Sequence, residues 1–323
     1  MTTEASTAAI RRAEALATEP LRPAGPRRGF VGGTAQSARD LWAHRELLGR
    51  LVKRELKARY KDSSLGFIWS LARPLAMLLI YYVALGQFLG QARGLPGFAV
   101  FIYSGLTAWG FFSEAIQTST SSVVNNAGLV KKVYLPREVF PLASIGSAAF
   151  NFAIQLVVLL LATLLVGHFP TGDRWGYFVL SVLVLFLYAT AFGIFLSAVN
   201  VYLRDVQYLV EIALMIFFWA SPIVYAWNFV QDAIAKTTLS QGLQHALMNI
   251  YLNNPATAAA LGFQRTFWVQ GDTPHPEMNP PYVPHFVPDL ALRLGIIAAV
   301  GVVLVWLASR VFARMQANFA QEL

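Results

Sequence analysis

KKVYLPRE, residues 131–138, is a short charged connector between two long apolar runs at 98–124 and 139–166. About 20 apolar residues are enough for a helix to cross a bilayer, and both runs exceed that length. Lys and Arg resist translocation, so a connector that carries three of them stays on the cytoplasmic face. The connector therefore predicts two membrane helices that meet on that face, and it fixes the direction of every other span.

The composition is that of an integral membrane protein. Hydrophobic residues make up 56% of the chain and charged residues 13%, whereas soluble domains average about 45–50% and about 25%. The mean hydropathy is +0.51. The net charge of +8 fits cytoplasmic loops that lie against anionic lipid headgroups, so we expect no nucleic-acid partner. The absence of cysteine excludes disulfides and thiolate chemistry.

Six segments are long and apolar enough to span the membrane, which predicts an all-α membrane protein. An even number of spans places both termini on one side. Most Lys and Arg residues between the spans fall in the segments assigned to the inner side, which indicates an N-in, C-in orientation. The six predicted spans are 66–89, 98–124, 139–166, 175–203, 206–227 and 290–312.

The chain divides into three parts. Residues 1–40 lack an apolar stretch of signal-peptide length, and we interpret them as a disordered cytoplasmic tail. Residues 41–61 are predicted to form an N-terminal amphipathic helix. Residues 62–323 are predicted to form the six-span domain, with a long outer loop at 228–289 between spans five and six.

The segment LWAHRELLGRLVKRELKARYK (41–61) repeats leucine and valine at helical spacing and carries seven cations on its other face. This pattern predicts a helix that lies in the cytoplasmic interface without crossing it. One interpretation is a passive anchor. The other is a phosphate-binding surface, because the cations exceed what anchoring needs.

The outer loop combines helical and extended patterns. Residues 233–266 predict two short helices that dip partway into the membrane and are broken at Asn254-Pro255. The following stretch, 271–289, is so rich in proline that we expect it to be extended. His275 and His285 lie in it without the spacing of a metal site, so we expect no bound metal.

Several polar and aromatic residues near the spans have both a structural and a functional interpretation. Glu114 is predicted to bond to a neighbouring helix or to line a path for a hydrophilic substrate. Arg73 is predicted to snorkel to the inner surface or to meet an anionic headgroup. Arg204-Asp205 is predicted to cap a helix end or to contact a cytoplasmic partner. The outer aromatic residues form an interfacial belt or a path for sugars.

The chain contains no GxxxxGK[ST], GxSxG or HExxH motif, so we expect neither a nucleotide site nor a catalytic centre in it. Acidic residues at membrane depth are few, which argues against a proton-coupled carrier. A transporter of this kind needs an external source of energy.

Two segments, RELKARYKDSSLGFIWSLARPL (54–75) and NNAGLVKKVYLPREVFPLAS (125–144), carry a family resemblance. Together with GLTAWGFFSEAI (105–116), YLRDV (202–206), FFWASPIVY (217–225) and LNNPATAAALGFQR (252–265), they resemble, in order, the ABC-2 type permeases that export bacterial cell-surface polysaccharides, the O-antigen and teichoic-acid group. The tail at 1–40 and the segment 270–289 are longer than that pattern.

The resemblance implies a six-span permease of the bacterial plasma membrane, with short outer gate helices, that forms a homodimer and binds two copies of a separate cytoplasmic ABC ATPase. ATP and Mg²⁺ would sit on that partner, and this chain would bind no cofactor. The implied substrate is a glycan on a polyprenyl pyrophosphate carrier. The Ala-, Arg- and Pro-rich composition suits a GC-rich genome and suggests a cell-wall galactan.

The resemblance and the residue patterns together assign four sets of site residues. Contact with the ATPase is expected from Asn126, Leu129, Lys131, Lys132, Tyr134, Pro136, Arg137, Glu138, Arg204 and Asp205. The lipid pyrophosphate is expected to meet Arg54, Lys57, Arg59, Lys61 and Arg73. The glycan path is expected to include Tyr81, Trp109, Phe111, Phe112, Glu114, Trp219 and Tyr225. The outer gate is expected to include Asn254, Pro255 and Arg265.

Two other functions remain open at this point. One is a membrane enzyme that acts on a polyprenyl-linked intermediate and uses the same cations, although the sequence lacks a cluster of acidic or histidine side chains at the membrane surface. The other is an ABC-2 exporter of a small lipid or drug.

Overall fold

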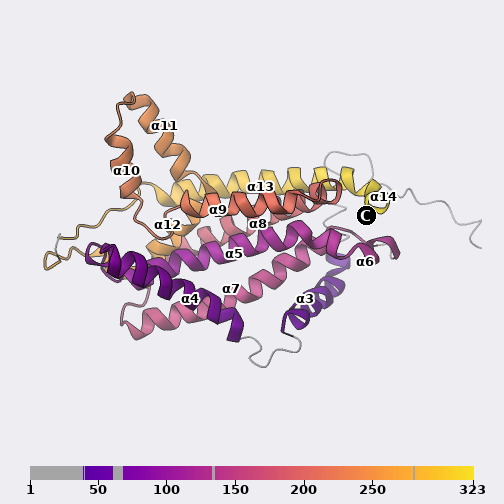
Figure 1. Ribbon diagram of the computed structural model, residues 1–323, viewed down its shortest axis with the longest axis horizontal. Coiled ribbons are helices and arrows are strands. Elements are labelled where there is room, and N and C mark those ends of the chain that lie inside the picture. The colour runs from indigo at the N-terminus through magenta and orange to yellow at the C-terminus, as the bar shows by residue number, and fades with distance from the viewer. Residues whose placement is uncertain (1–38, 40, 61–67, 133–134, 279–280) are drawn as a thin grey trace, which may run out of the picture.

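The protein is a bundle of long helices that run along its longest axis (Figure 1). The structure, a computed structural model, describes residues 39, 41–60, 68–132, 135–278 and 281–323. Within these residues the chain is helical apart from turns, loops and one isolated bridge between His275 and Tyr282. The predicted all-α class is therefore confirmed. The predicted tail lies outside the described residues except for position 39.

Four helices of the described residues are long and apolar enough to cross a membrane. They match predicted spans two, three, four and six to within a few residues: α5 (Phe98–Asn125), α7 (Val139–Leu165), α8 (Arg174–Tyr202) and α13 (Leu290–Met315). Two further apolar helical segments, Pro74–Phe88 and α9 (Val206–Trp219), are shorter. At about 1.5 Å per residue, α9 falls short of the roughly 30 Å of a hydrocarbon core. The count of six spans thus stays a prediction.

The fifth predicted span ends earlier than the sequence pattern indicated. It was expected to reach residue 227, but α9 ends at Trp219. Pro222 explains the difference, because proline lacks a backbone N–H and disfavours a helical residue before it. The chain then turns back into the bundle, where Ile223 and Val224 are buried.

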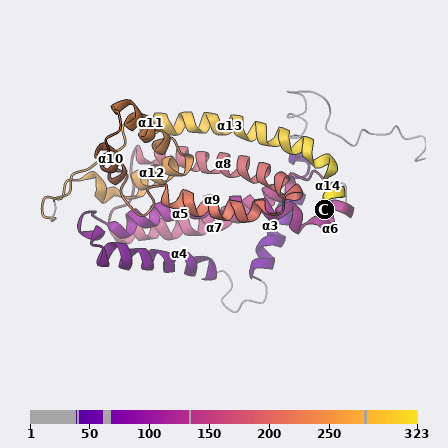
Figure 2. The same cartoon turned by 45° about the horizontal axis from the view of Figure 1, so that its top comes forward.

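The first predicted span consists of an α-helix followed by a π-helix. α4 (Ile68–Tyr81) contains Pro74 and continues directly into a π-helix at Tyr82–Phe88. The predicted start at residue 66 lies outside the described residues. Both views place α4 at one edge of the bundle and α13 at the opposite edge (Figures 1 and 2).

α5 is the central helix and packs against α7, α8, α9 and the short helix α12. It buries hydroxyl side chains as well as apolar ones. The hydroxyls of Ser104, Thr107, Thr120 and Ser122 donate to carbonyl groups one turn earlier in the same helix, at 2.7 to 2.8 Å. Because these donors are satisfied locally, α5 can lie in the core without water.

One end of the bundle, which we name the loop end, carries three short helices, α10 (Asn228–Ala235), α11 (Gln241–Leu252) and α12 (Pro255–Phe267). α10 and α11 project from the bundle, whereas α12 is buried among α5 and α8 (Figure 1). The break at Asn254-Pro255 is present as predicted, but the structure has three short helices where two were predicted, and their depth in a membrane stays a prediction. Asn254 caps α12 by accepting a bond from the Ala256 amide at 3.0 Å, and Pro255 occupies the first turn.

The other end, which we name the connector end, carries α3 (Arg45–Tyr60), α6 (Ala127–Lys132) and α14 (Phe319–Glu322). The helix predicted over 41–61 is present as α3, and its place in the membrane interface stays a prediction. It packs on α7, with Leu51 buried and Val52 close to Gly146.

The close contact between α5 and the turn after α9 yields a stability prediction. A Cβ at Gly105 would lie 2.9 Å from the carbonyl oxygen of Ile223 and 3.2 Å from its Cα. Backbone atoms cannot relieve such a contact by a change of rotamer, as a side chain can. We therefore expect Gly105→Ala to destabilise the protein by about 1–3 kcal/mol, measured as a lower thermal unfolding midpoint in detergent.

Gly295→Ala in α13 is the matched control, since no atom lies within 4 Å of its added Cβ. Its midpoint should equal or exceed that of the wild type, because alanine favours a helix over glycine. Equal midpoints for the two variants would contradict the close contact.

Candidate functional site

A polar cluster joins α3 to the centre of the bundle. Arg59 of α3 forms an ion pair with Glu114 of α5, and Asn151 of α7 donates to the same carboxylate at 2.7 Å. The side chains of Arg59 and Glu114 are 37% and 24% exposed. Glu114 therefore bonds to a neighbouring helix, as the structural interpretation predicted. Its partial exposure leaves its role in a substrate path as a prediction.

Two other residues of α3 contact the rest of the connector end. Arg54 donates to the Asn126 side chain at 2.5 Å, and Asn126 donates in turn to the Ser122 carbonyl at 2.8 Å. Ser144 of α7 donates to Glu55 at 3.2 Å. Burial raises the pKa of the Glu55 carboxyl above its usual range, against the opposing effects of the Ser144 bond and of Arg54 and Arg59. The sequence pattern did not single out Glu55.

The predicted phosphate-binding cations are only partly described. Arg54, Lys57 and Arg59 lie on exposed positions of α3. Arg73 belongs to α4, and Lys61 lies outside the described residues. Three of the predicted phosphate-binding cations therefore share one helix, and two of these three are also bonded to the bundle.

The predicted ATPase-contact residues divide into exposed and inward-facing groups. Lys131 is exposed and Leu129 and Pro136 are half-buried. Glu138, in contrast, is 5% exposed. Lys132 ends α6, and Tyr134 lies outside the described residues. Lys131 is thus the described cation of the connector that is open to a partner.

Arg137 faces inward, contrary to its expected role as a contact on the surface. It donates to the backbone carbonyl of Gln316, and its guanidinium lies 5.7 Å from the centre of the Phe319 ring. The connector is therefore attached to the segment that follows α13. Tyr202 of α8 fastens the same segment by donating to the Met315 carbonyl at 2.7 Å.

Arg204 and Asp205 are exposed in the turn between α8 and α9. Asp205 occupies the capping position of α9, yet its side chain makes no capping bond. Asn200 instead accepts from the Gln207 amide at 3.2 Å. The capping interpretation therefore fails for the Asp205 side chain, and the contact with a partner stays a prediction.

Three of the predicted glycan-path rings contact Phe218, and Tyr225 is hydrogen-bonded to one of these residues. Tyr81 stacks on Phe218 with ring centres 5.8 Å apart, and Trp109 meets it edge-on at 5.7 Å. Trp219 follows in sequence at 5.4 Å and accepts a bond on its carbonyl from Tyr225 at 2.9 Å. Trp219 is 55% exposed.

Phe111 and Phe112, which were also predicted for the glycan path, are not exposed to a ligand. Both are buried, and Phe111 packs against Phe152 and Phe186 at 5.0 and 4.5 Å. Phe111 thus belongs to the core between α5, α7 and α8, and Phe112 packs against Trp109 with ring centres 5.9 Å apart. The structure therefore corrects the prediction that these two rings line a glycan path, because buried rings offer no surface to a sugar.

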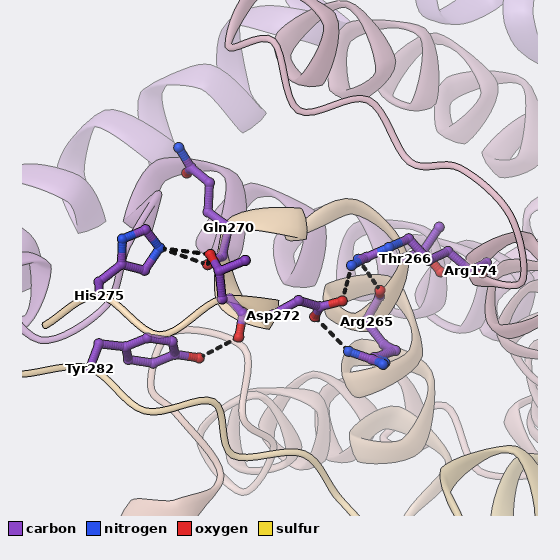
Figure 3. A network of polar contacts seen from close by, with 9 residues as sticks. Arg174, Arg265, Thr266, Gln270, Asp272, His275 and Tyr282 are labelled. Atoms are coloured by element: carbon purple, nitrogen blue, oxygen red, sulfur yellow. Dashed lines mark hydrogen bonds and ion pairs between the residues drawn. The ribbon is translucent and has the colours of Figure 1, made fainter.

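Arg265, predicted as a gate residue, belongs to a polar network at the loop end (Figure 3). Asp272 binds Arg174 through one carboxylate oxygen and Arg265 through the other, the latter at 2.5 Å. Arg174 also donates to the Arg265 carbonyl at 3.0 Å, and Thr266 donates to the Arg174 carbonyl at 3.2 Å. This network joins residues 268–278 and 281–288, which we name the strap, to α8 and α12.

The strap has further attachments beyond the two arginines. Trp268 donates to the Pro96 carbonyl at 2.5 Å, and Tyr282 donates to the Gly271 carbonyl at 2.8 Å. Burial raises the pKa of Tyr282 to about 12, so its hydroxyl remains a donor. The adjacent Glu277 carboxylate raises the pKa of His275. No group of three or more metal-ligating side chains occurs among the described residues.

The cluster of Arg59, Glu114 and Asn151 yields a prediction about coupled stability. We expect Arg59→Gln and Glu114→Gln each to destabilise the protein, because each leaves a charge without its partner. The double substitution should cost less than the sum of the two, by about 0.5–2 kcal/mol, when unfolding is measured in detergent.

Glu211→Gln combined with Arg59→Gln is the control, since the described residues show no ion pair for Glu211. Those two effects should add to within about 0.5 kcal/mol. Additivity of Arg59→Gln and Glu114→Gln would show that the ion pair does not form.

Comparisons with known proteins agree with this architecture. The profile of the ABC-2 type transporter family matches residues 46–236. The chain is 31% identical to the O-antigen export system permease protein RfbA of Myxococcus xanthus, over 88% of this chain and 98% of that protein. It is 30% identical to RfbA of Klebsiella pneumoniae over 58% and 71%, and 26% identical to the polysialic acid transport protein KpsM of Escherichia coli over 61% and 76%. The chain therefore belongs to the ABC-2 type transporter family, as a membrane permease homologous to these polysaccharide export proteins.

Proposed function

We propose that the chain is the transmembrane subunit of an ATP-driven exporter that moves a polysaccharide on a polyprenyl pyrophosphate carrier to the outer side of the plasma membrane. The observation that carries this proposal is the similarity to an O-antigen export permease over nearly the whole length of that relative. The names of the relatives favour a polysaccharide over a small lipid or a drug. They also favour transport over an enzymatic reaction.

The energy would come from a separate ABC ATPase, in two copies, with ATP and Mg²⁺ bound there. The chain itself has no phosphate-binding loop motif. The exposed Lys131 on α6, between two membrane helices, suits a contact through which a partner could move the bundle. Arg204 and Asp205, also exposed, would add a second contact at the same end.

The lipid pyrophosphate would be recognised along α3. Lys57 is exposed, and Arg54 and Arg59 use only part of their five N–H donors in the bonds described above. A diphosphate carries several negative charges and forms strong charge-assisted bonds with such donors. Arg73 of α4 would lie farther along the same route.

The path for the glycan would run between two copies of the chain. A two-fold pair is the commonest symmetric assembly. In each copy, α9 and the helical run 68–88 would be the fifth and first of six spans. The rings of Tyr81, Trp109, Trp219 and Tyr225 would offer flat apolar surfaces to sugars. At the loop end, the helices around Asn254-Pro255 and Arg265 would form the outer gate.

The proposed orientation places α6 inside the cell and α11 outside. The chain contains no cysteine, so single cysteines report position cleanly. Gly128 in α6 and Gly242 in α11 are both exposed, and no atom lies within 4 Å of an added Cβ. We expect a membrane-impermeant maleimide to label Gly242→Cys in intact cells, and Gly128→Cys only after the cells are opened. Labelling in the reverse order would refute the N-in, C-in orientation.

The proposed coupling contact depends on Lys131. Charge reversal at an interface slows association and weakens the complex. We expect Lys131→Glu to lower both the amount of ATPase that co-purifies and the rate of ATP-dependent glycan export by about tenfold, which is about 1.4 kcal/mol. Lipid-linked glycan should accumulate inside the cells.

Lys236→Glu, an exposed cation at the opposite end of the bundle, is the matched control and should leave both measurements unchanged. Arg137 is unsuitable as a test of coupling, because it holds the segment after α13. Normal export together with normal co-purification in Lys131→Glu would overturn the assignment of this contact.

A further inference from the structure

The loop end contains a cavity of about 650 Å³ to which no ligand has been assigned above. It lies between the strap, the segment at 89–95, the turn at 226–229 and the C-terminal part of α12. Its size falls within the roughly 300–1,000 Å³ of small-molecule sites. We propose that this cavity binds a sugar unit of the glycan that the protein exports. The inference rests on the proposed function for the identity of the glycan.

The walls of the cavity carry aromatic rings that a ligand can reach. Phe229 and Phe286 are 51% and 37% exposed, although both line the cavity. Trp227, another lining residue, donates its ring N–H to the His285 carbonyl at 3.0 Å, which fixes the ring. Flat apolar rings with a fixed orientation suit the apolar face of a sugar ring.

The charges in the cavity favour a sugar over a phosphate group. No Asp or Glu occurs among the described residues that line it, and its two guanidinium groups are those of Arg93 and Arg265. Asp272 pairs with Arg265, although it shares its single negative charge with Arg174, and Arg265 also lies 3.9 Å from the centre of the Phe286 ring. A phosphate needs several convergent cations, whereas the exposed Arg93 alone suits a hydroxyl or a single acidic substituent of a sugar.

The strap makes the cavity rigid before a ligand arrives. Asp272 joins the strap to α8 and α12 (Figure 3). The Tyr282 bond joins the two arms of the strap, and the Trp268 bond attaches the strap to Pro96. Tyr282 and Trp268 themselves line the cavity. A site whose walls are already ordered loses little entropy when it binds.

Binding can be tested on the full chain in lipid nanodiscs without ATPase or ATP. The probes are the oligosaccharide released by mild acid from the lipid-linked glycan of the producing cells, and its free constituent monosaccharides. Saturation-transfer difference NMR detects binding into the millimolar range. We expect Arg93→Ala combined with Phe229→Ala to weaken binding at least about tenfold, because a charge-assisted bond and a ring contact are lost together.

Lys236→Ala combined with Ile250→Ala is the matched control, since both residues are exposed at the loop end and neither lines the cavity. It should change affinity less than about twofold. Wild-type protein that binds none of the saccharides at millimolar concentrations would overturn the inference, as would equal binding by the two double variants or displacement of the probe by phospholipid headgroups. If ATP-dependent export persists in those cases, the proposed function stands. Loss of both saccharide binding and ATP-dependent export would reject the proposed function as well.

Discussion

Inside a bilayer a polar group has no water to bond to, so a helix at the centre of a membrane bundle has to satisfy its polar side chains within the protein. α5 meets this constraint in two ways. Ser104, Thr107 and Thr120 donate to carbonyls of the same helix, and its one carboxylate, Glu114, bonds to Arg59 and Asn151 from outside. The second solution requires α3 to dock on the bundle. The central helix and the amphipathic helix therefore depend on each other.

Much of this architecture could be predicted from the sequence. The existence of the helices follows from long apolar runs, and the four long helices begin and end within a few residues of the predicted limits. The break at Asn254-Pro255 was also predictable, because asparagine before proline is a local capping signal that needs no tertiary information.

Other features could not be predicted, because they depend on contacts between distant segments. Nothing local in the pattern KKVYLPRE indicates that Arg137 faces Gln316 and Phe319, which lie far along the chain. Phe111 and Phe112 likewise look the same in sequence as Trp109, yet neighbouring helices bury them. The end of α9 had a local signal in Pro222, but a long apolar run around it concealed that signal.

The inward position of Arg137 has a mechanical consequence for the connector. Asn126 joins α6 to the end of α5, Glu138 directly precedes α7, and Arg137 grips the polypeptide just beyond α13. A force on this connector is thereby shared among three long helices, α5, α7 and α13.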